Sequence, residues 1–237
     1  MKIRGIIFDK DGTLFDIQRS WSEWAKVFVT KFSNQHNLDK LKLAKAINFD
    51  LASDQFLRES IFVHGSVDEV VDAIFQKFPQ VMKKKIHEGL FEGSGDAKQV
   101  PLTNLHKLFK NLETITFGLV TNDSETNAIK HLEQHNLTQY FDMIIGYDSG
   151  YGSKPEPGHL EAFLRKTNLP SQEVLMIGDS TYDLVAANKI SMPCLGVLSG
   201  TANKKDLSAH TPFLIDSIDD LEAVSYSHLT LPTSDLV

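Results

Sequence analysis

The sequence contains little cysteine, no long apolar run and no excess of basic charge. Its single cysteine, Cys194, stands in an apolar stretch, so a disulfide framework within the 237-residue chain is excluded and a buried thiol is expected. No apolar run approaches membrane-spanning length, and the chain enters an apolar strand without the basic region of a signal peptide. The net charge of -7 argues against a nucleic-acid-binding surface. We therefore expect a cytoplasmic protein that binds neither nucleic acid nor membrane.

A long helical segment is predicted between residues 15 and 90. The first helix places its apolar residues at i, i+3, i+4, i+7, i+8 and i+11, at positions Trp21, Trp24, Ala25, Phe28, Val29 and Phe32. Further helices are expected near residues 41–47, 54–62 and 66–78, the last opened by a capping box at Ser66 and Glu69. No strand pattern interrupts these helices, so the whole segment is expected to be helical.

The chain begins with a short strand that ends in two carboxylates. Residues 3–8 are mostly apolar, as in a strand buried on both faces of a parallel sheet, and they lead into Asp9, Asp11, Gly12 and Thr13. Residues two apart at a strand end can point the same way, so both carboxylates can reach one reacting centre. Phosphoryl chemistry needs such a pair, but an Asp-Gly turn after a strand has the same residues.

Strands and helices alternate from Pro101 onward, and Pro101 is itself expected in the first turn of a helix. The predicted strands cover residues 115–120, 141–145, 174–177, 193–198 and 213–215. This alternation predicts an α/β fold in which a parallel sheet has helices on both faces. Functional residues collect at the carboxyl ends of such strands, which here hold Asp9, Asp11, Thr121, Asn122, Asp179 and Asp183, with Lys154 in a nearby loop.

These residue types suit phosphoryl transfer. Asp9 can act as a nucleophile that forms an aspartyl-phosphate. Because a carboxylate and a phosphate repel each other, the site needs a cation, and Mg²⁺ prefers oxygen ligands such as Asp9 and Asp179. Lys154 adds a fixed positive charge beside the phosphate.

The remaining residues at the strand ends have roles in the same chemistry. Thr121 and Asn122 offer a hydroxyl, an amide and backbone NH groups to phosphate oxygens, and Asp11 can protonate the leaving alcohol and then deprotonate water. Each residue also has a purely structural interpretation. Lys154 can be an ordinary loop lysine, Asp183 a helix-surface residue or a partner that orients Lys154, and the Thr121–Asn122 pair a helix cap.

Taken together, the pattern resembles the haloacid dehalogenase superfamily. Its four motifs are matched in order by Asp9-Lys10-Asp11-Gly12-Thr13, the strand ending in Thr121, Lys154-Pro155, and Gly178-Asp179-Ser180-Thr181-Tyr182-Asp183. The resemblance implies a Rossmann-like core of residues 1–14 and 93–224 and an inserted all-helical (C1-type) cap of residues 15–92. Residues 225–237 have no clear period and are expected to be disordered or foreign to the domain. Tyr140-Phe141-Asp142 and Lys154-Pro155-Glu156-Pro157 are similar to the phosphoglycolate phosphatase-like group.

The resemblance also implies roles for the residues of the motifs. It assigns Asp9 as nucleophile and Mg²⁺ ligand, Asp11 as acid/base and as a ligand through its backbone carbonyl, and Asp179 as a further ligand. Asp183 is expected to support the site. The residues expected to bind the substrate are Gly12, Thr13, Thr121, Asn122 and Lys154.

Two departures from the family pattern carry expectations of their own. Lys10 stands where an apolar residue is usual, which predicts a cation near the mouth of the site. Residues 189–191, Lys-Ile-Ser, replace a common Ala-Gly, so the local turn is expected to differ.

The leading hypothesis is a Mg²⁺-dependent phosphatase acting on a small phosphorylated metabolite, of phosphoglycolate or sugar-phosphate type. A phosphosugar mutase with the same two aspartates is the first alternative, and a non-catalytic module that binds a phosphorylated ligand is the second. The sequence does not name the substrate or the oligomeric state. Candidates for selecting the leaving group are Asp16, Arg19, Trp21 and Arg58.

Overall fold

The computed structural model describes residues 2–57, 60–200 and 202–221. Arg58 and the segment 225–237, for which the sequence carried predictions, lie outside the described residues. Within the described part, no helix combines the length and the apolar character needed to cross a membrane.

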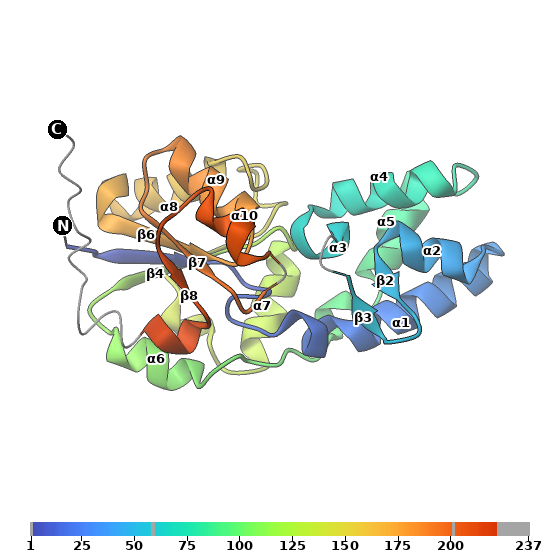
Figure 1. Ribbon diagram of the computed structural model, residues 1–237, viewed down its shortest axis with the longest axis horizontal. Helices are drawn as coiled ribbons and strands as arrows, with labels where there is room; N and C mark the ends of the chain where they lie inside the picture. Colours follow the sequence, from blue (N-terminus) through green and yellow to red (C-terminus); the bar gives the residue numbers. More distant parts are fainter. Residues whose placement is uncertain (1, 58–59, 201, 222–237) are drawn as a thin grey trace.

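A six-stranded parallel sheet forms the centre of the larger part of the molecule (Figure 1). Its strands are β1 (Gly5–Phe8), β4 (Thr116–Val120), β5 (Met143–Ile145), β6 (Val174–Gly178), β7 (Cys194–Val197) and β8 (Leu214–Ile215). The order is β5-β4-β1-β6-β7-β8, and every neighbouring pair is parallel. The predicted α/β sheet is thereby confirmed. The first strand of the chain lies between β4 and β6, so Asp9 emerges near the middle of the sheet's carboxyl edge.

Helices cover both faces of this sheet. They are α6 (Leu105–Asn111), α7 (Glu125–Glu133), α8 (Gly158–Thr167), α9 (Thr181–Lys189) and α10 (Lys204–Ser208), with short 3-10 turns η1 (Ser94–Asp96), η2 (Thr138–Tyr140), η3 (Ser171–Glu173) and η4 (Ile218–Asp220). Alternation along β1 sends Phe8 toward Phe109 of α6 and Ile7 toward Phe163 of α8, in two separate hydrophobic clusters. A strand buried on both faces explains the apolar run in the sequence.

The chain that follows β1 folds into a second group of helices, which lies beside the sheet (Figure 1). Its helices are α1 (Ile17–His36), α2 (Lys40–Ala46), α3 (Ile61–His64), α4 (Val67–Lys77) and α5 (Lys83–Phe91). They bury a hydrophobic cluster of their own, which includes Trp24, Phe28, Ile74 and Ile86. The Asp16 side chain caps α1 by accepting from the Arg19 NH at 2.9 Å. The domain boundaries at residues 14/15 and 92/93 stay a prediction.

The helical segment contains a hairpin that the sequence analysis did not predict. Strands β2 (Phe49–Asp50) and β3 (Gln55–Phe56) pair antiparallel where residues 54–62 were expected to be helical. Asp54 adopts a left-handed φ of 54°, which no helix interior allows. The Gln18 side chain fixes the hairpin to α1, because it donates to the Phe56 carbonyl and accepts from the Phe56 NH, both at 2.9 Å. The cap is therefore helical with one short hairpin, and α3 is reduced to a single turn.

Two further local expectations concern Pro101 and the turn at residues 189–191. Pro101 does not open a helix: α6 begins at Leu105 behind an Asn104 cap, and Pro101 instead forms an isolated bridge with Phe15. The turn after α9 places Ser191 at φ 52°, a left-handed position that favours glycine. That this turn differs from the one in relatives stays a prediction.

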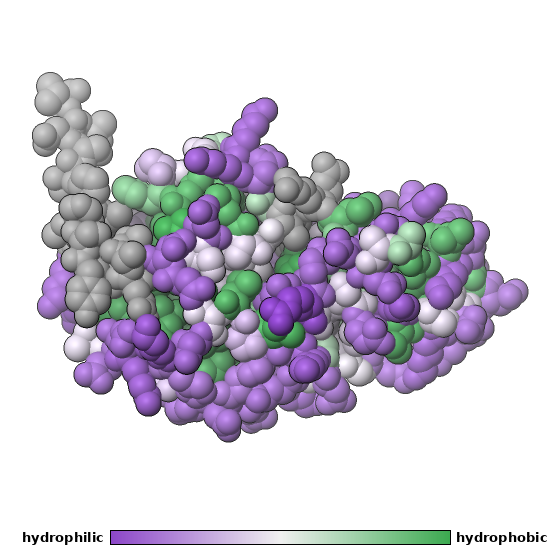
Figure 2. Space-filling model, turned by 60° about the horizontal axis from the view of Figure 1, so that its bottom comes forward, coloured by the Kyte–Doolittle hydropathy of each residue, from purple (hydrophilic) through white to green (hydrophobic). Residues whose placement is uncertain are grey.

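The face of the molecule in Figure 2 carries hydrophilic residues over most of its area, with apolar residues in separate small patches. Large exposed apolar side chains are likewise dispersed along the described chain, at Val27, Leu41, Leu57, Met82 and Tyr151. Isolated apolar residues on a surface are ordinary in water-facing proteins.

Candidate active site

A buried ion pair lies where β1 ends. The Asp9 backbone NH bonds to the Ile177 carbonyl of β6, and its side chain is 6% exposed. The Lys154 ammonium lies 2.6 Å from Asp9 Oδ1 and 2.7 Å from Asp183 Oδ1. Of the two interpretations of Asp183, the ion pair with Lys154 is the one present. Three residues far apart in the sequence thus meet at one edge of the sheet.

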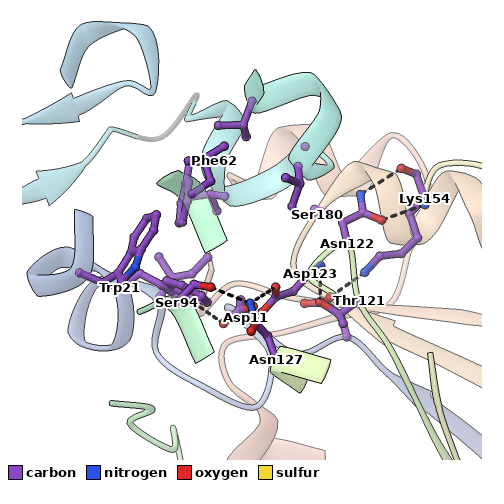
Figure 3. Close-up of a pocket in the computed structure, with 18 of the residues that line it drawn as sticks. Asp11, Trp21, Phe62, Ser94, Thr121, Asn122, Asp123, Asn127, Lys154 and Ser180 are labelled. Carbon is purple, nitrogen blue, oxygen red and sulfur yellow. Dashed lines mark hydrogen bonds and ion pairs between the residues drawn. The ribbon is translucent and has the colours of Figure 1, made fainter. Parts of the chain in front are cut away.

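The Lys154 loop is held in place by Asn122, which follows β4. The Asn122 amide donates to the Lys154 carbonyl at 3.0 Å and accepts from the Lys154 NH at 2.9 Å (Figure 3). Lys154 Nζ also donates to the Val120 carbonyl at 3.2 Å. The Asn122 side chain, expected on the phosphate, therefore already serves to position Lys154. Its role in substrate binding stays a prediction.

Burial sets the electrostatics of this pair. Desolvation raises the pKa of Asp9 to about 7, against the opposing effect of Lys154. Burial alone would lower the pKa of Lys154, but Asp183 and Asp9 together raise it above its ordinary value. The lysine is therefore permanently charged. The Asp9 carboxyl gains or loses its proton near neutral pH, and a bound cation can change its pKa.

The turn at Gly12 packs against Asp179. Gly12 has a φ of 88°, and a Cβ there would lie 2.5 Å from Asp179 Oδ2, so only glycine fits both the backbone and the space. A Cβ on Gly200 would meet the same oxygen at 1.7 Å. Thr13 is buried beside this turn, and its hydroxyl has no hydrogen-bond partner among the described residues. The backbone around Asp179 is shaped to keep that carboxylate close to the first strand.

Oxygen ligands for a divalent cation gather at this point. Carboxylate oxygens of Asp9, Asp179 and Asp183 lie within 4.8 Å of one another, and all three residues are buried. Asp183 is bonded to Lys154 and accepts from the Ser180 NH at 3.1 Å and the Ser180 hydroxyl at 2.6 Å. The donor set suits Mg²⁺. The predicted ligands Asp9 and Asp179 both belong to this cluster, and ligation by the Asp11 backbone carbonyl stays a prediction.

Lys10 does not lie at the mouth of the site, so that expectation is wrong. Its side chain is fully buried, and its ammonium lies 2.6 Å from Asp123 Oδ2, 2.8 Å from His131 Nδ1 and 3.1 Å from Asp11 Oδ2. The reason is that Asp11, Asp123 and His131 surround the Lys10 ammonium and keep it away from solvent. Burial opposes its charge, but Asp11 and Asp123 raise the pKa of Lys10 above its ordinary value.

The protonation of His131 follows from its neighbours. Burial, and then the Lys10 ammonium, lowers the pKa of His131 to about 4, so the ring is neutral at pH 7. An ammonium can only donate, so Nδ1 of His131 accepts from Lys10, and Nε2 carries the hydrogen that bonds to the Ser94 carbonyl at 3.0 Å. Sequence reasoning missed His131 and Asp123. Lys10 was the one signal for them, because a lysine at the end of a buried strand needs a buried partner for its charge.

Asp11 is held from two directions. Besides the Lys10 ammonium, the indole NH of Trp21 in α1 donates to Asp11 Oδ1 at 2.7 Å. The predicted acid/base is thus fixed by one residue of the sheet edge and by one residue of the first cap helix.

Thr121 lies across the site and is 2% exposed. Its hydroxyl accepts from the Asp123 NH at 3.1 Å.

A cavity opens between the sheet edge and helices α1, α3, α4 and α5. Trp21 and Phe62 lie on one side of it, and Thr121, Asn122 and Lys154 on the other (Figure 3). Of the four candidates for selecting the leaving group, Trp21 lines this cavity, whereas Asp16 caps α1 and Arg19 is exposed outside the cavity. The structure therefore brings the predicted motif residues Asp9, Asp11, Thr121, Asn122, Lys154 and Asp179 to one cavity.

The fold and site match a known family. A family model described as haloacid dehalogenase-like hydrolase matches residues 6–197. The chain belongs to this family. The resemblance indicated by the four motifs is thereby confirmed.

Relatives of this hydrolase have phosphatase names. A phosphoglycolate phosphatase of Photobacterium profundum is 27% identical over 219 residues, which cover 90% of this chain and 91% of that protein. A phosphoglycolate phosphatase of Vibrio parahaemolyticus is 34% identical over 114 residues, which cover 47% of this chain and only 50% of that protein. The structure of CbbY from Rhodobacter sphaeroides in complex with phosphate is similar with a TM-score of 0.70 at 19% identity, covering 92% of this chain and 96% of that one.

Proposed function

We propose that this hydrolase is a Mg²⁺-dependent phosphatase that cleaves a small phosphate monoester through an aspartyl-phosphate on Asp9. One observation carries the proposal: a buried nucleophile candidate, Asp9, lies 2.6 Å from a permanently charged ammonium, Lys154, and beside a second carboxylate, Asp179. Phosphoryl transfer depends chiefly on positioning and charge compensation around the phosphate oxygens, which this arrangement can supply. The names of the relatives support the same class of reaction.

Each residue has a defined task in this reaction. An Asp9 carboxylate oxygen attacks phosphorus, the bond from phosphorus to the ester oxygen breaks, and Asp11 delivers a proton to the departing alcohol. Water then attacks the aspartyl-phosphate, Asp11 takes its proton, and phosphate leaves Asp9 free. Lys154 and Thr121 hold phosphate oxygens during both steps. Bound Mg²⁺, held by Asp9 and Asp179, would compensate the charge of the phosphate.

The mutase alternative is less well supported by the cavity. A phosphosugar mutase has to hold a second phosphate away from the nucleophile, which calls for cationic or hydrogen-bonding groups there. Among the described residues that line the cavity, Lys154 is the only cationic side chain, and it lies beside Asp9. Binding without catalysis is also disfavoured, because neither the nucleophile nor the lysine is missing.

Phosphate release from small esters with and without Mg²⁺ tests the proposal. Wild-type protein should release phosphate only with the cation, and Asp9→Asn should abolish release, since an amide is a poor nucleophile. Asp72→Asn, an equivalent change in an exposed ion pair with Lys83, should leave release unchanged. Absence of release from every ester by a folded wild-type protein, or full activity in Asp9→Asn, would overturn it.

A further inference from the structure

The cavity wall opposite the catalytic carboxylates is apolar and has unused surface. Apolar side chains of the cap line it, among them Trp21, Phe62, Val63, Val67, Leu90 and Phe91. Trp21 and Leu90 are buried in the cap, but Phe62, Val63, Val67 and Phe91 remain partly exposed. If these four residues served only to pack the cap, further burial would be favourable. Their accessible surface in the cavity wall therefore calls for another explanation.

The aromatic part of this wall is fixed by packing. The Phe62 ring stacks on Phe56 at 4.9 Å between centroids and on Trp24 at 5.1 Å, and meets Trp21 edge-on at 5.4 Å. Trp21 is further held by its bond to Asp11. A ring held by three others is a rigid surface, so a flat apolar ligand binds it with little loss of side-chain freedom.

Polar groups of η1 and α7 that line the cavity are already committed. The Asn127 amide donates to the Ser94 hydroxyl at 2.9 Å and to Asp123 at 3.0 Å, and the Ser94 hydroxyl donates to the Phe91 carbonyl at 3.0 Å. A sugar with several hydroxyl groups would find few donors there. Polar groups buried without partners are costly, so such a leaving group is disfavoured.

Charge disfavours a carboxylate on the leaving group for a similar reason. Within the described lining, the carboxylates are those of Asp9, Asp11, Asp123 and Asp179, and Lys154 is the one ammonium. The Lys10 ammonium behind this lining is already paired with Asp11 and Asp123. Lys154 is bonded to Asp9 and Asp183 and is reserved for the phosphate in the proposed function. A second anionic group on the ester would therefore be buried beside apolar side chains without a counter-ion.

We infer that the leaving group of this phosphatase is an uncharged apolar alcohol with a flat, preferably aromatic, body that lies against Trp21 and Phe62. The inference rests on the proposed function and makes it specific. The overall reaction is hydrolysis of an aryl or arylalkyl phosphate to the alcohol and inorganic phosphate. It departs from the phosphoglycolate named for the relatives, whose alcohol carries a carboxylate.

Turnover of paired esters tests the inference. Wild-type kcat/KM should be at least about tenfold higher for benzyl phosphate than for 2-phosphoglycolate, since apolar pocket contacts discriminate by roughly 10–200-fold. Phe62→Ala should lower kcat/KM for benzyl phosphate about tenfold, yet change it less than about twofold for methyl phosphate, which does not reach the wall. Phe75→Ala, the same change at a partly buried cap residue outside the cavity, should alter neither.

Binding of inert analogues separates this inference from the proposed function. Benzylphosphonate should quench tryptophan fluorescence at lower concentration than phosphonoacetate, in wild type and in Asp9→Asn. If no ester is hydrolysed but this order of binding holds, the proposed function fails, and the cavity wall at Trp21 and Phe62 stands as a binding site for an apolar group on a phosphorylated ligand. Preference for phosphoglycolate or phosphonoacetate would overturn the inference, most directly if Arg58→Ala, outside the described residues, removed that preference. Equal losses on benzyl and methyl phosphate in Phe62→Ala would also overturn it.

Discussion

The Lys10 ammonium donates to Nδ1 of His131 at 2.8 Å, and both side chains are fully buried behind Asp11. The same ammonium contacts Asp123 and Asp11, so one cation satisfies two carboxylates and one imidazole. This cluster links the end of β1 to α7 and to the loop before it.

Removing the cation should destabilise the protein. Lys10→Met leaves Asp123 and Asp11 without their buried counter-ion, so we expect the free energy of unfolding to fall by about 3–5 kcal/mol. Urea unfolding measures the change. The control is Lys26→Met, which breaks the exposed pair with Asp54 and should lower the free energy of unfolding far less. A Lys10→Met protein as stable as Lys26→Met would contradict the role assigned to Lys10.

Trp21→Phe should reduce turnover more than substrate binding. The change keeps an aromatic ring on the cavity wall but removes the NH that holds Asp11 Oδ1 at 2.7 Å. A hydrogen bond to a charged group contributes about 1.5–3 kcal/mol, so kcat should fall by about tenfold to a hundredfold while KM changes little. Trp24→Phe is the matched control, because its NH donates to the Glu92 backbone carbonyl instead. Equal effects of the two variants would argue that only ring packing matters.

Two buried histidines should make stability sensitive to acid. Burial is the main cause that lowers the pKa of both His131 and His159 to about 4, from 6.5 in the unfolded chain. Between pH 6.5 and pH 4 the unfolded chain therefore binds protons that the folded protein does not, and each histidine removes up to about 3 kcal/mol as the pH falls through this window.

The raised pKa of Asp9 acts in the opposite direction, so the prediction concerns a difference between proteins. The free energy of unfolding of His159→Leu minus that of wild type should increase as the pH falls from 6.5 to 4, and should level off below 4. Urea unfolding at a series of pH values measures it. A flat difference for His159→Leu would show that folding does not lower the pKa of His159.

Metal binding should release a proton from Asp9. Burial raises the pKa of Asp9 to about 7, whereas a divalent cation requires the carboxylate, so Mg²⁺ affinity should fall by up to tenfold per pH unit below 7. Calorimetry in two buffers of different ionisation enthalpy counts the protons released. Asp9→Asn should bind weakly without proton release. Affinity independent of pH between 5.5 and 7.5 would contradict this prediction.

Much of the site was predictable because the topology of the sheet brings its residues together. Asp9, Thr121 and Asp179 each directly follow an apolar strand, and parallel strands place such residues on one edge whatever their separation in sequence. The Asp183 to Lys154 pair was one of two interpretations, since a residue after a helix cap has no inherent partner until the fold brings one.

Other features depend on contacts that no local pattern encodes. Strands β2 and β3 are two residues each, too short for any alternation, and the hairpin depends on a left-handed Asp54 and on the distant Gln18. Lys10 is buried because Asp123 and His131, more than a hundred residues away, arrive beside it. The sequence therefore shows where the positive charge stands in the chain, but not which distant residues will pair with it.

The excess of carboxylates along the cavity has a consequence for the order of events. A phosphate dianion that approaches the metal-free protein meets repulsion from charges of its own sign, so encounter should become faster as ionic strength rises. With a divalent cation already seated, that dependence should weaken or reverse. We therefore expect ordered association, in which the cation binds first and the ester binds only to the protein that already holds it.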